Sequence, residues 1–433
     1  MSGSTAYAFT NARLIDPSQG LDETGSLVVQ DGKIVACGKD AEIPAKIDTQ
    51  DCKGLALLPG LIDMQVFTGE PGEEHRETLA TASQAAAAGG VTGMVTMPNT
   101  NPVIDDAALV DFITRRARDT AIVRIHPMAA LTMGCNGKSM TEFGLLSEAG
   151  AVGFTDGDRA VMNALTMRRA LSYAATFDAL VMQHAMDQDL QSAGVMHEGE
   201  LATRLGLAGI PVAAETAMID RDLRLVALTG GRYHIAQISA AESVETIRAA
   251  KARGIDVSCG VSATHLMLNQ NDVENYRSFA KLNPPLRREE DRLALIGGVA
   301  DGTIDVIVSG HNPQDAEAKR QPFAQAAYGT VGVETLLPGL LTLHHADGID
   351  LATLLACVTS RPADLLGLDS GSLKIGAAAD FSLIDLDAPW VVDADSLLSK
   401  SQNAAIDGRK VQGRVHATYV DGIRVFSLGG DDA

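Results

Sequence analysis

Short apolar runs recur along the middle of the chain, and each is bounded by polar or turn-forming residues. Between many of them lie stretches with the spacing of amphipathic helices, such as 77–89 and 241–254. The eight runs are 61–66, 91–97, 121–127, 151–154, 179–184, 232–238, 255–261 and 304–310. Eight strand and helix units in a span of about 300 residues predict a (β/α)8 TIM barrel.

The two ends of the chain follow a different pattern, in which apolar and polar residues alternate between turns. Asp31-Gly32 separates two alternating segments near the amino terminus, and Asp421-Gly422 does the same near the carboxyl terminus. Both dipeptides favour tight β-hairpin turns. We therefore expect a small, discontinuous β-sandwich domain from residues 1–55 and 366–433, and the barrel from residues 56–365.

The composition agrees with a soluble protein that has a large core, and its charge argues against two classes of partner. Hydrophobic residues make up 46% of the chain but aromatic residues only 4%, so the core must consist mainly of aliphatic side chains. The net charge of −20 repels phosphate backbones and anionic lipids, so neither nucleic acid nor a membrane is an expected partner. The five cysteines are scattered without a C-x-x-C pair, which favours the cytoplasm.

The residues at the carboxyl ends of the predicted strands carry the chemistry of a barrel enzyme, because its active site lies on the loops that follow the strands. In chain order these positions hold Gln65 and Phe67, Asn99, His126, Asp156, His184, Gln237, residues 259–265, and Gly310 with His311.

A series of longer motifs surrounds these positions. The stretch LLPGLIDMQVFTGEPG is followed by GGVTGMVTMPNTNP, VMQHA, HIAQIS, KLNPPLRREEDR, DGTIDVIVSGHNP and GSLKIGAAADFSLID. In this order, the motifs resemble those of bacterial dihydroorotases of the cyclic amidohydrolase superfamily, from about residue 6 to residue 426. The resemblance implies a metal-bearing (β/α)8 barrel with a small β domain from both termini. It also implies hydrolysis of dihydroorotate to carbamoyl aspartate by a metal-bound hydroxide.

Compared with that family, the chain departs at the positions that carry chemistry. The family's first-strand His-x-His falls on Gln65 and Phe67, and its sixth-strand histidine falls on Gln237. Its catalytic aspartate falls on Gly310, and the arginine that binds the substrate carboxylate falls on Gly69. A carboxamide offers only a weak neutral oxygen, a phenyl ring offers no lone pair, and glycine cannot accept a proton.

Other family positions are retained. Asp156 matches a carboxylate ligand, His184 matches the fifth-strand histidine ligand, and Asn99 and Asn283 match substrate-binding residues, while His311 resembles a retained loop residue. Two protein ligands are fewer than the three of a catalytic zinc site. We therefore expect no metal and no catalytic residue, with Asp156 and His184 as vestigial ligands. Asn99, Asn283 and His311 remain as candidates for residual substrate binding.

Structural roles also explain several of these residues. His184 could be a hydrogen-bonded residue of the core, and Asp156 could cap a helix or stabilise a turn. The two asparagines precede or neighbour prolines, where the backbone favours extended and turn geometry.

From these departures we predict a catalytically inactive dihydroorotase homologue, a pseudoenzyme of pyrimidine biosynthesis. Inactive chains of this type are associated with aspartate transcarbamoylase, so the resemblance implies a structural or assembly role with its catalytic chain, in a homo-oligomer. The alternative is an active zinc-dependent dihydroorotase, or another cyclic amidohydrolase, with an atypical site. A third hypothesis is a ligand-sensing pocket in which Asn99 and Asn283 bind a pyrimidine precursor.

Overall fold

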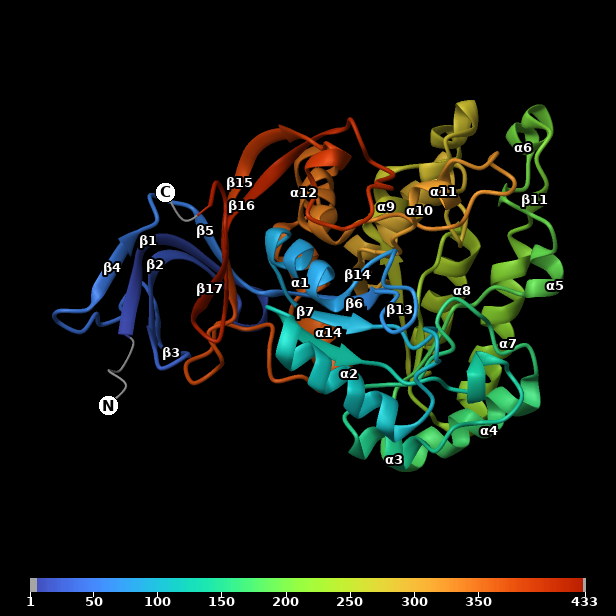
Figure 1. The fold of residues 1–433 in the computed structure, drawn as a ribbon, viewed down its shortest axis with the longest axis horizontal. Helices are drawn as coiled ribbons and strands as arrows, with labels where there is room; N and C mark the ends of the chain where they lie inside the picture. Colours follow the sequence, from blue (N-terminus) through green and yellow to red (C-terminus); the bar gives the residue numbers. More distant parts are fainter. Residues whose placement is uncertain (1–5, 431–433) are drawn as a thin grey trace.

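Strands from both ends of the chain pair in one sheet. The computed structural model describes residues 6–430, and the sheet has the order β17-β16-β15-β5-β1-β2-β3, with β4 beside β1. Its strands are β1 (Ala6–Asp16), β2 (Leu21–Gln30), β3 (Lys33–Gly38), β4 (Asp48–Asp51), β5 (Ala56–Pro59), β15 (Phe381–Val391), β16 (Lys410–Val420) and β17 (Ile423–Ser427). Figure 1 shows the blue amino-terminal and red carboxyl-terminal strands together, beside the rest of the molecule. The two-layered sandwich and the domain boundaries stay predictions.

The two predicted hairpin turns are confirmed. Asp31 and Gly32 have φ values of 50° and 77° and connect β2 to the antiparallel β3. Asp421 and Gly422 have φ values of 49° and 73° and connect β16 to β17. Left-handed conformations at both central residues define the type I′ turn, whose twist matches that of the strands.

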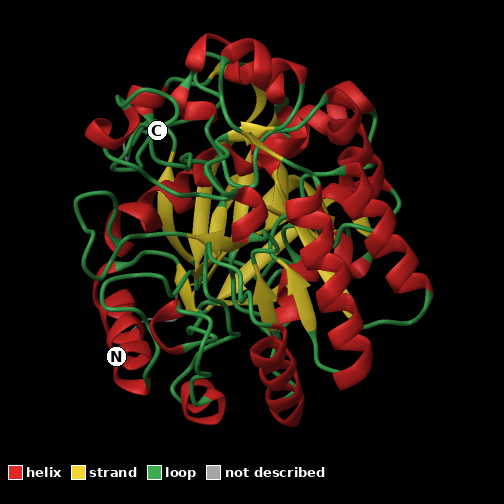
Figure 2. Ribbon diagram, turned by 90° about the vertical axis from the view of Figure 1, so that its right-hand side faces the viewer, coloured by secondary structure: helices red, strands yellow, loops and turns green. Residues whose placement is uncertain are grey.

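Seven of the eight apolar runs in the middle of the chain form parallel strands in the part that the structure describes. They are β6 (Leu61–Val66), β7 (Val91–Thr96), β8 (Arg124–Pro127), β9 (Val181–Gln183), β12 (Tyr233–Ile235), β13 (Val257–Ser262) and β14 (Val306–Val308). The run at 151–154 contributes only Phe154, which forms single bridges to Ala129 and Val181. A bridge between Val66 and His311 links β6 to the segment after β14. Together the strands and bridges close a barrel, which helices surround in Figure 2.

Helices connect the barrel strands, as the apolar spacing predicts. They are α1 (Leu79–Ala88), α2 (Ala107–Thr120), α3 (Phe143–Glu148), α4 (Ala164–Ala174), α5 (Gln188–Gln191), α6 (Glu200–Leu205), α7 (Ala213–Thr229), α8 (Ala241–Ala252), α9 (Ala263–Met267), α10 (Glu289–Ala300), α11 (Ala316–Lys319), α12 (Leu336–Asp347), α13 (Leu351–Ala356) and α14 (Ser360–Leu366). A short parallel pair, β10 (Met196–His197) and β11 (Gly209–Ile210), lies between α5 and α7. Within residues 6–430, no helix is both long and apolar enough to cross a membrane.

Methionines fill much of one buried cluster inside the barrel. Met64, Met97, Met128 and Met182 pack there with valine, leucine and alanine side chains from several strands. Phe67 follows β6 and packs against this cluster. The unbranched, polarisable methionine side chain adapts to irregular space, so the cluster can pack closely against the aromatic ring.

One arginine ties the barrel to the terminal sheet. Arg124 of β8 donates to both carboxylate oxygens of Asp380, at 2.5 and 3.1 Å, and to Asp421 at 2.5 Å. Asp380 directly precedes β15, and its side chain is only 4% exposed. A buried carboxylate needs compensating donors, so the contact with Arg124 stabilises the packing of the terminal sheet against the barrel.

We expect Arg124→Met to lower the free energy of unfolding by about 2 kcal/mol, because it leaves Asp380 buried without its charged partner. Urea denaturation measures this loss. The matched control is Arg118→Met, whose exposed guanidinium pairs with the exposed Asp119 and whose loss should change stability by less than about 0.5 kcal/mol. Equal losses in the two variants would contradict the proposed connection.

Candidate functional site

A cavity lies at the carboxyl ends of the barrel strands, where a barrel of this type holds its active site. Its walls come from the segments that follow β6, β9, β12, β13 and β14, so residues far apart in sequence meet there. The predicted site residues on these walls are Gln65, Phe67, His184, Gln237, Asn283 and Gly310.

Two buried carboxamides occupy the centre of this site. Gln237 donates from Nε2 to Oε1 of Gln65 at 2.9 Å. Gln237 is only 7% exposed and Gln65 only 4%. Gly310 lies directly against this pair, because a Cβ built on it would be 2.9 Å from Gln237 Nε2. The missing side chain at residue 310 therefore makes room for the carboxamide of Gln237.

His184 faces the cavity beside Asn283. The residue is 3% exposed, and Nε2 makes no close hydrogen bond among the described residues. Burial lowers the pKa of His184 from 6.5, although the negative charges of Asp158 and Glu215 and a hydrogen bond with the Asn283 side chain act in the opposite direction. The imidazole is therefore neutral at neutral pH, and a neutral imidazole has one nitrogen that can accept a proton.

Asn283 and His265 lie on the same wall of the cavity. Asn283 precedes a cis peptide bond to Pro284, and its buried Oδ1 makes no close hydrogen bond within residues 6–430. His265 pairs with Ser262 Oγ at 2.7 Å through Nδ1 and with the Pro284 carbonyl at 3.0 Å through Nε2. Burial lowers the pKa of His265 to about 4. His265 therefore supports the wall as a neutral residue, whereas the Asn283 side chain interacts with that of His184.

Asp156 does not line the cavity, although it matches a family ligand position. Its carboxylate accepts from the backbone N–H of Thr132 at 2.8 Å and also from the Thr132 hydroxyl. Burial raises the pKa of Asp156, while these donors act against the rise. The side chain thus fixes the loop after β8, in line with the turn-stabilising role that such residues often have.

Asn99 lies in an adjoining cavity rather than in the central one. That neighbouring space shares Phe67, Asp158, Asn312 and Tyr328 with the central cavity and is also lined by Arg76. Asn99 donates to Asp158 at 3.1 Å, while its buried Oδ1 has no partner in the described part of the chain. Asn99 can therefore contact only a ligand that reaches the adjoining cavity.

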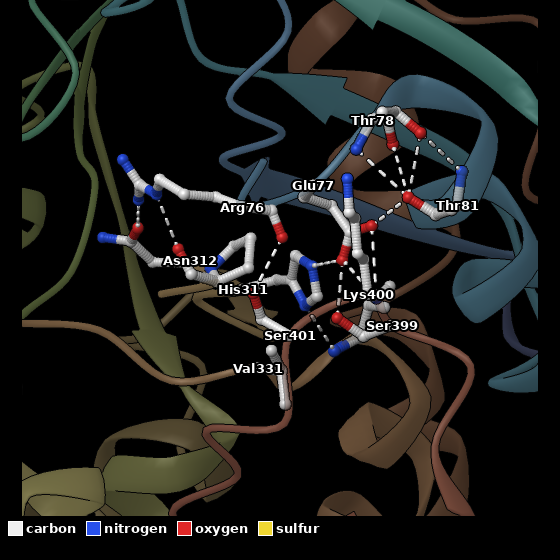
Figure 3. A network of polar contacts seen from close by, with 12 residues as sticks. Arg76, Glu77, Thr78, Thr81, His311, Asn312, Val331, Ser399, Lys400 and Ser401 are labelled. Carbon is white, nitrogen blue, oxygen red and sulfur yellow. Dashed lines mark hydrogen bonds and ion pairs between the residues drawn. The ribbon is translucent and has the colours of Figure 1, made fainter. Parts of the chain in front are cut away.

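His311 belongs to a buried network beside the cavity (Figure 3). Its Nδ1 accepts from the Gly332 backbone at 3.2 Å, and its Nε2 is 3.6 Å from Glu77 Oε2. Glu77 also accepts from Ser399 Oγ at 2.6 Å and from the Lys400 backbone. His311 does not line the cavity, so the structure gives it an anchoring role instead of the predicted contact with substrate.

Sequence reasoning missed Glu77 completely. Burial acts to raise its pKa, but the contacts with His311 and with hydroxyl donors outweigh burial and hold the pKa below 4.5. The residue lies between β6 and α1 and gives no motif or spacing signal. Only its position next to the N-cap residue Thr78 could have drawn attention to it.

The residues of the site do not fit the metal centre that the family resemblance implies. Within residues 6–430, no group of three or more His, Cys, Asp or Glu side chains could hold a metal ion. Two carboxamides, a phenyl ring and a glycine occupy the family's ligand and catalytic positions, and Asp156, which binds Thr132, does not line the cavity. Neutral amide oxygens are poor ligands for zinc, which prefers histidine, cysteine and carboxylate.

The closed barrel with a cavity at its strand ends is the architecture of the amidohydrolases, and solved structures agree. L-hydantoinase from Arthrobacter aurescens superposes with a TM-score of 0.87 at 26% identity, covering 97% of this chain and 96% of that one. Dihydropyrimidinase from Brevibacillus agri superposes with a TM-score of 0.84 at 20% identity, over 98% and 95% of the two chains. The α/β barrel prediction is thus confirmed.

Sequence comparison identifies the family within this class. The family model described as Dihydro-orotase-like matches residues 54–243. Curated proteins named dihydroorotase include one from Geotalea daltonii, 45% identical over 95% of this chain and 96% of its own length. Another, from Ehrlichia chaffeensis, is 44% identical over 96% of this chain and 94% of its own length. The chain belongs to the dihydroorotase family.

These relatives correct one prediction. Curated relatives at 41% to 45% identity, which cover nearly the whole chain, are named dihydroorotase and contradict the predicted inactive assembly subunit for aspartate transcarbamoylase. That prediction rested on five substituted positions, whereas the similarity extends over the barrel and both ends. The alternative prediction, a cyclic amidohydrolase with an atypical site, agrees better with the comparison.

We expect Gly310→Ala to destabilise the protein more than Gly348→Ala, by at least about 1 kcal/mol in urea denaturation. Both glycines have left-handed φ values, 63° and 68°, so an alanine would strain the backbone at either position. Only residue 310 adds a close contact, because nothing lies within 4 Å of a Cβ at Gly348. Equal destabilisation would mean that the position of the Gln237 carboxamide does not require a glycine at residue 310.

Proposed function

We propose that this chain is a cyclic amidohydrolase, which opens the ring amide of dihydroorotate or of a closely related cyclic amide. The observation that carries the proposal is the similarity, over nearly the whole chain, to proteins named dihydroorotase. The structural likeness to L-hydantoinase supports the wider class of cyclic amides. The cavity at the strand ends is the proposed site of the reaction.

The reaction needs a proton acceptor for water and a donor for the carbonyl oxygen. Neutral His184 on the cavity wall is the proposed acceptor, because a neutral imidazole has one nitrogen that can take up a proton. The amide N–H groups of Gln65 supply donors that can stabilise negative charge on the carbonyl oxygen. Water oxygen bonds to the ring carbonyl carbon, His184 takes its proton, and the same proton passes to the ring nitrogen as the carbon–nitrogen bond breaks. The proposed reaction uses groups of the protein and water alone.

We expect His184→Gln to lower kcat for ring opening by at least about 100-fold, because glutamine cannot take up the proton. The measurement is the absorbance change on hydrolysis of dihydroorotate, together with the reverse cyclisation of carbamoyl aspartate. The control is His75→Gln, an exposed residue that does not line the central cavity and should leave kcat unchanged.

Each assay is run on protein dialysed against a chelator and again after zinc is added. Equal turnover in both conditions agrees with the metal-free site. Turnover that appears only with zinc would contradict the metal-free assignment, and absence of turnover with every cyclic amide tested would contradict the proposed function.

The pH profile tests His184 separately. Its pKa lies below 6.5 because of burial, and the base must be unprotonated to act. We therefore expect kcat/KM to be constant from about pH 7 to about pH 8 and to fall only at pH values below 6.5. An acid limb centred above pH 6.5 would mean that another group accepts the proton.

A further inference from the structure

A fully buried ion pair lies outside the central cavity, next to segments that form its wall. It joins Arg287, on the loop before α10, to Glu215, in the first turn of α7. The nitrogen and oxygen are 3.2 Å apart, and the two side chains are only 0% and 1% exposed. Two charges lose so much hydration on burial that such a pair often stabilises a fold no more than apolar side chains do. What the pair does provide is a fixed direction for each of its hydrogen bonds.

The Glu215 carboxylate holds the segment that follows β12. It accepts from the backbone N–H of Ser239 at 2.9 Å, from that of Ala240 at 3.2 Å, and from the Ser239 hydroxyl. Ser243 Oγ of α8 donates to the same carboxylate at 2.6 Å. Burial acts to raise the pKa of Glu215, but the paired guanidinium and the serine donors outweigh burial and hold the pKa below 4.5. The carboxylate therefore stays ionised and keeps all these donors in place.

The Arg287 guanidinium connects its own loop to two other segments. Its Nε donates to Ser239 Oγ at 2.7 Å, and its Nη1 donates to His197 Nδ1 in β10 at 3.2 Å. Burial lowers the pKa of His197 to about 4, and the charge of Arg287 acts in the same direction, so the imidazole is neutral and can accept. With the contact to Glu215, each of the three guanidinium nitrogens has a partner. This rigid planar fork fixes the relative position of the groups that it binds.

Two of the connected segments carry residues of the cavity wall. Gln237 lies just before Ser239 in the HIAQIS motif, and Asn283 lies on the same loop as Arg287 in the KLNPPLR motif. Because Arg287 binds Ser239 directly, it sets how far apart the two segments lie. The serine and the arginine of these motifs thus have a physical role that sequence reasoning did not assign.

The same ion pair also reaches the segment that carries His184. The backbone N–H of Asp187, just after His184, donates to the Ala214 carbonyl at 2.7 Å, and Ala214 directly precedes Glu215 in α7. Burial lowers the pKa of His184, and the negative charge of Glu215 acts against this effect. Glu215 therefore bears on both the place and the charge of the proposed base.

We infer that Glu215 and Arg287 form a positioning unit, which sets the geometry of the cavity segments after β9, β12 and β13 without touching the substrate. The inference rests on the proposed function for the reaction that these segments serve. It adds a pair of residues outside the cavity on which the arrangement of the wall depends. Ser239 is the shared contact of the unit, because its hydroxyl donates to Glu215 and accepts from Arg287.

The test removes this shared hydroxyl and leaves both charges in place. Ser239→Ala takes one donor from Glu215 and the acceptor from Arg287 Nε. The matched control, Ser243→Ala, takes one donor from the same carboxylate but lies on α8, away from the residues that line the cavity. Both serines are buried, at 1% and 0% exposed, so the two substitutions remove hydroxyls from similar surroundings. Urea denaturation and circular dichroism measure the stability and the folded fraction of each variant.

The first measurement needs no substrate. Backbone hydrogen exchange of the full chain, followed by mass spectrometry, should be at least about five-fold faster in Ser239→Ala over residues 183–187, 237–241 and 281–288, because all three segments lose their common support. Ser243→Ala should change exchange over residues 183–187 and 281–288 by less than about two-fold. A change confined to residues 237–241, or equal changes in the two variants, would overturn the inference.

The second measurement is turnover of dihydroorotate per folded chain. Ser239→Ala should lower kcat by at least about ten-fold with KM within about three-fold, because small displacements of catalytic groups act on the transition state. Arg124→Met, which is destabilised at the terminal sheet, should keep the parent kcat, since lower stability alone does not displace the wall. An unchanged kcat in folded Ser239→Ala protein would contradict the positioning role. If the parent chain turns over no cyclic amide, the proposed function fails, and the exchange measurement still decides whether the unit holds the three segments.

Discussion

A carboxamide removed from water must have partners for its oxygen and its N–H groups, and this requirement shapes the centre of the site. Gln65 and Gln237 satisfy part of it through one hydrogen bond to each other. The bond needs space that a side chain at residue 310 would occupy, so Gly310 is part of the same arrangement. Three departures from the family pattern thus form one physical unit, in which neutral groups replace charged and ligating ones.

Local sequence patterns were sufficient to predict most elements of the fold. Alternation and turn residues predicted the two hairpins, and apolar runs predicted seven barrel strands in the described part of the chain. The run at 151–154 failed as a strand, because only Phe154 forms bridges to its neighbours. A short apolar run shows that a segment is buried, but it does not show whether the backbone pairs along its length.

The candidate site could be predicted only in part. Strand ends correctly placed Gln65, His184 and Gln237 around one cavity, because parallel strands in a barrel end at the same rim. The direction of a loop side chain depends on partners that sequence spacing does not reveal. Asp156 turns to Thr132, and His311 turns to Glu77, although both positions looked equivalent to His184 in the sequence.

The network around Glu77 joins three segments that are distant in sequence. The loop before α1 supplies Glu77, the segment after β14 supplies His311, and the stretch after β15 supplies Ser399 and Lys400. The carboxyl-terminal stretch therefore completes the interior of the barrel rim as well as returning to the terminal sheet. The barrel is consequently not a self-contained module, since a fragment that ended at residue 365 would lack the Ser399 hydroxyl and the Lys400 amide that donate to this buried carboxylate. Any recombination of this barrel with a different terminal domain must bring these donors with it.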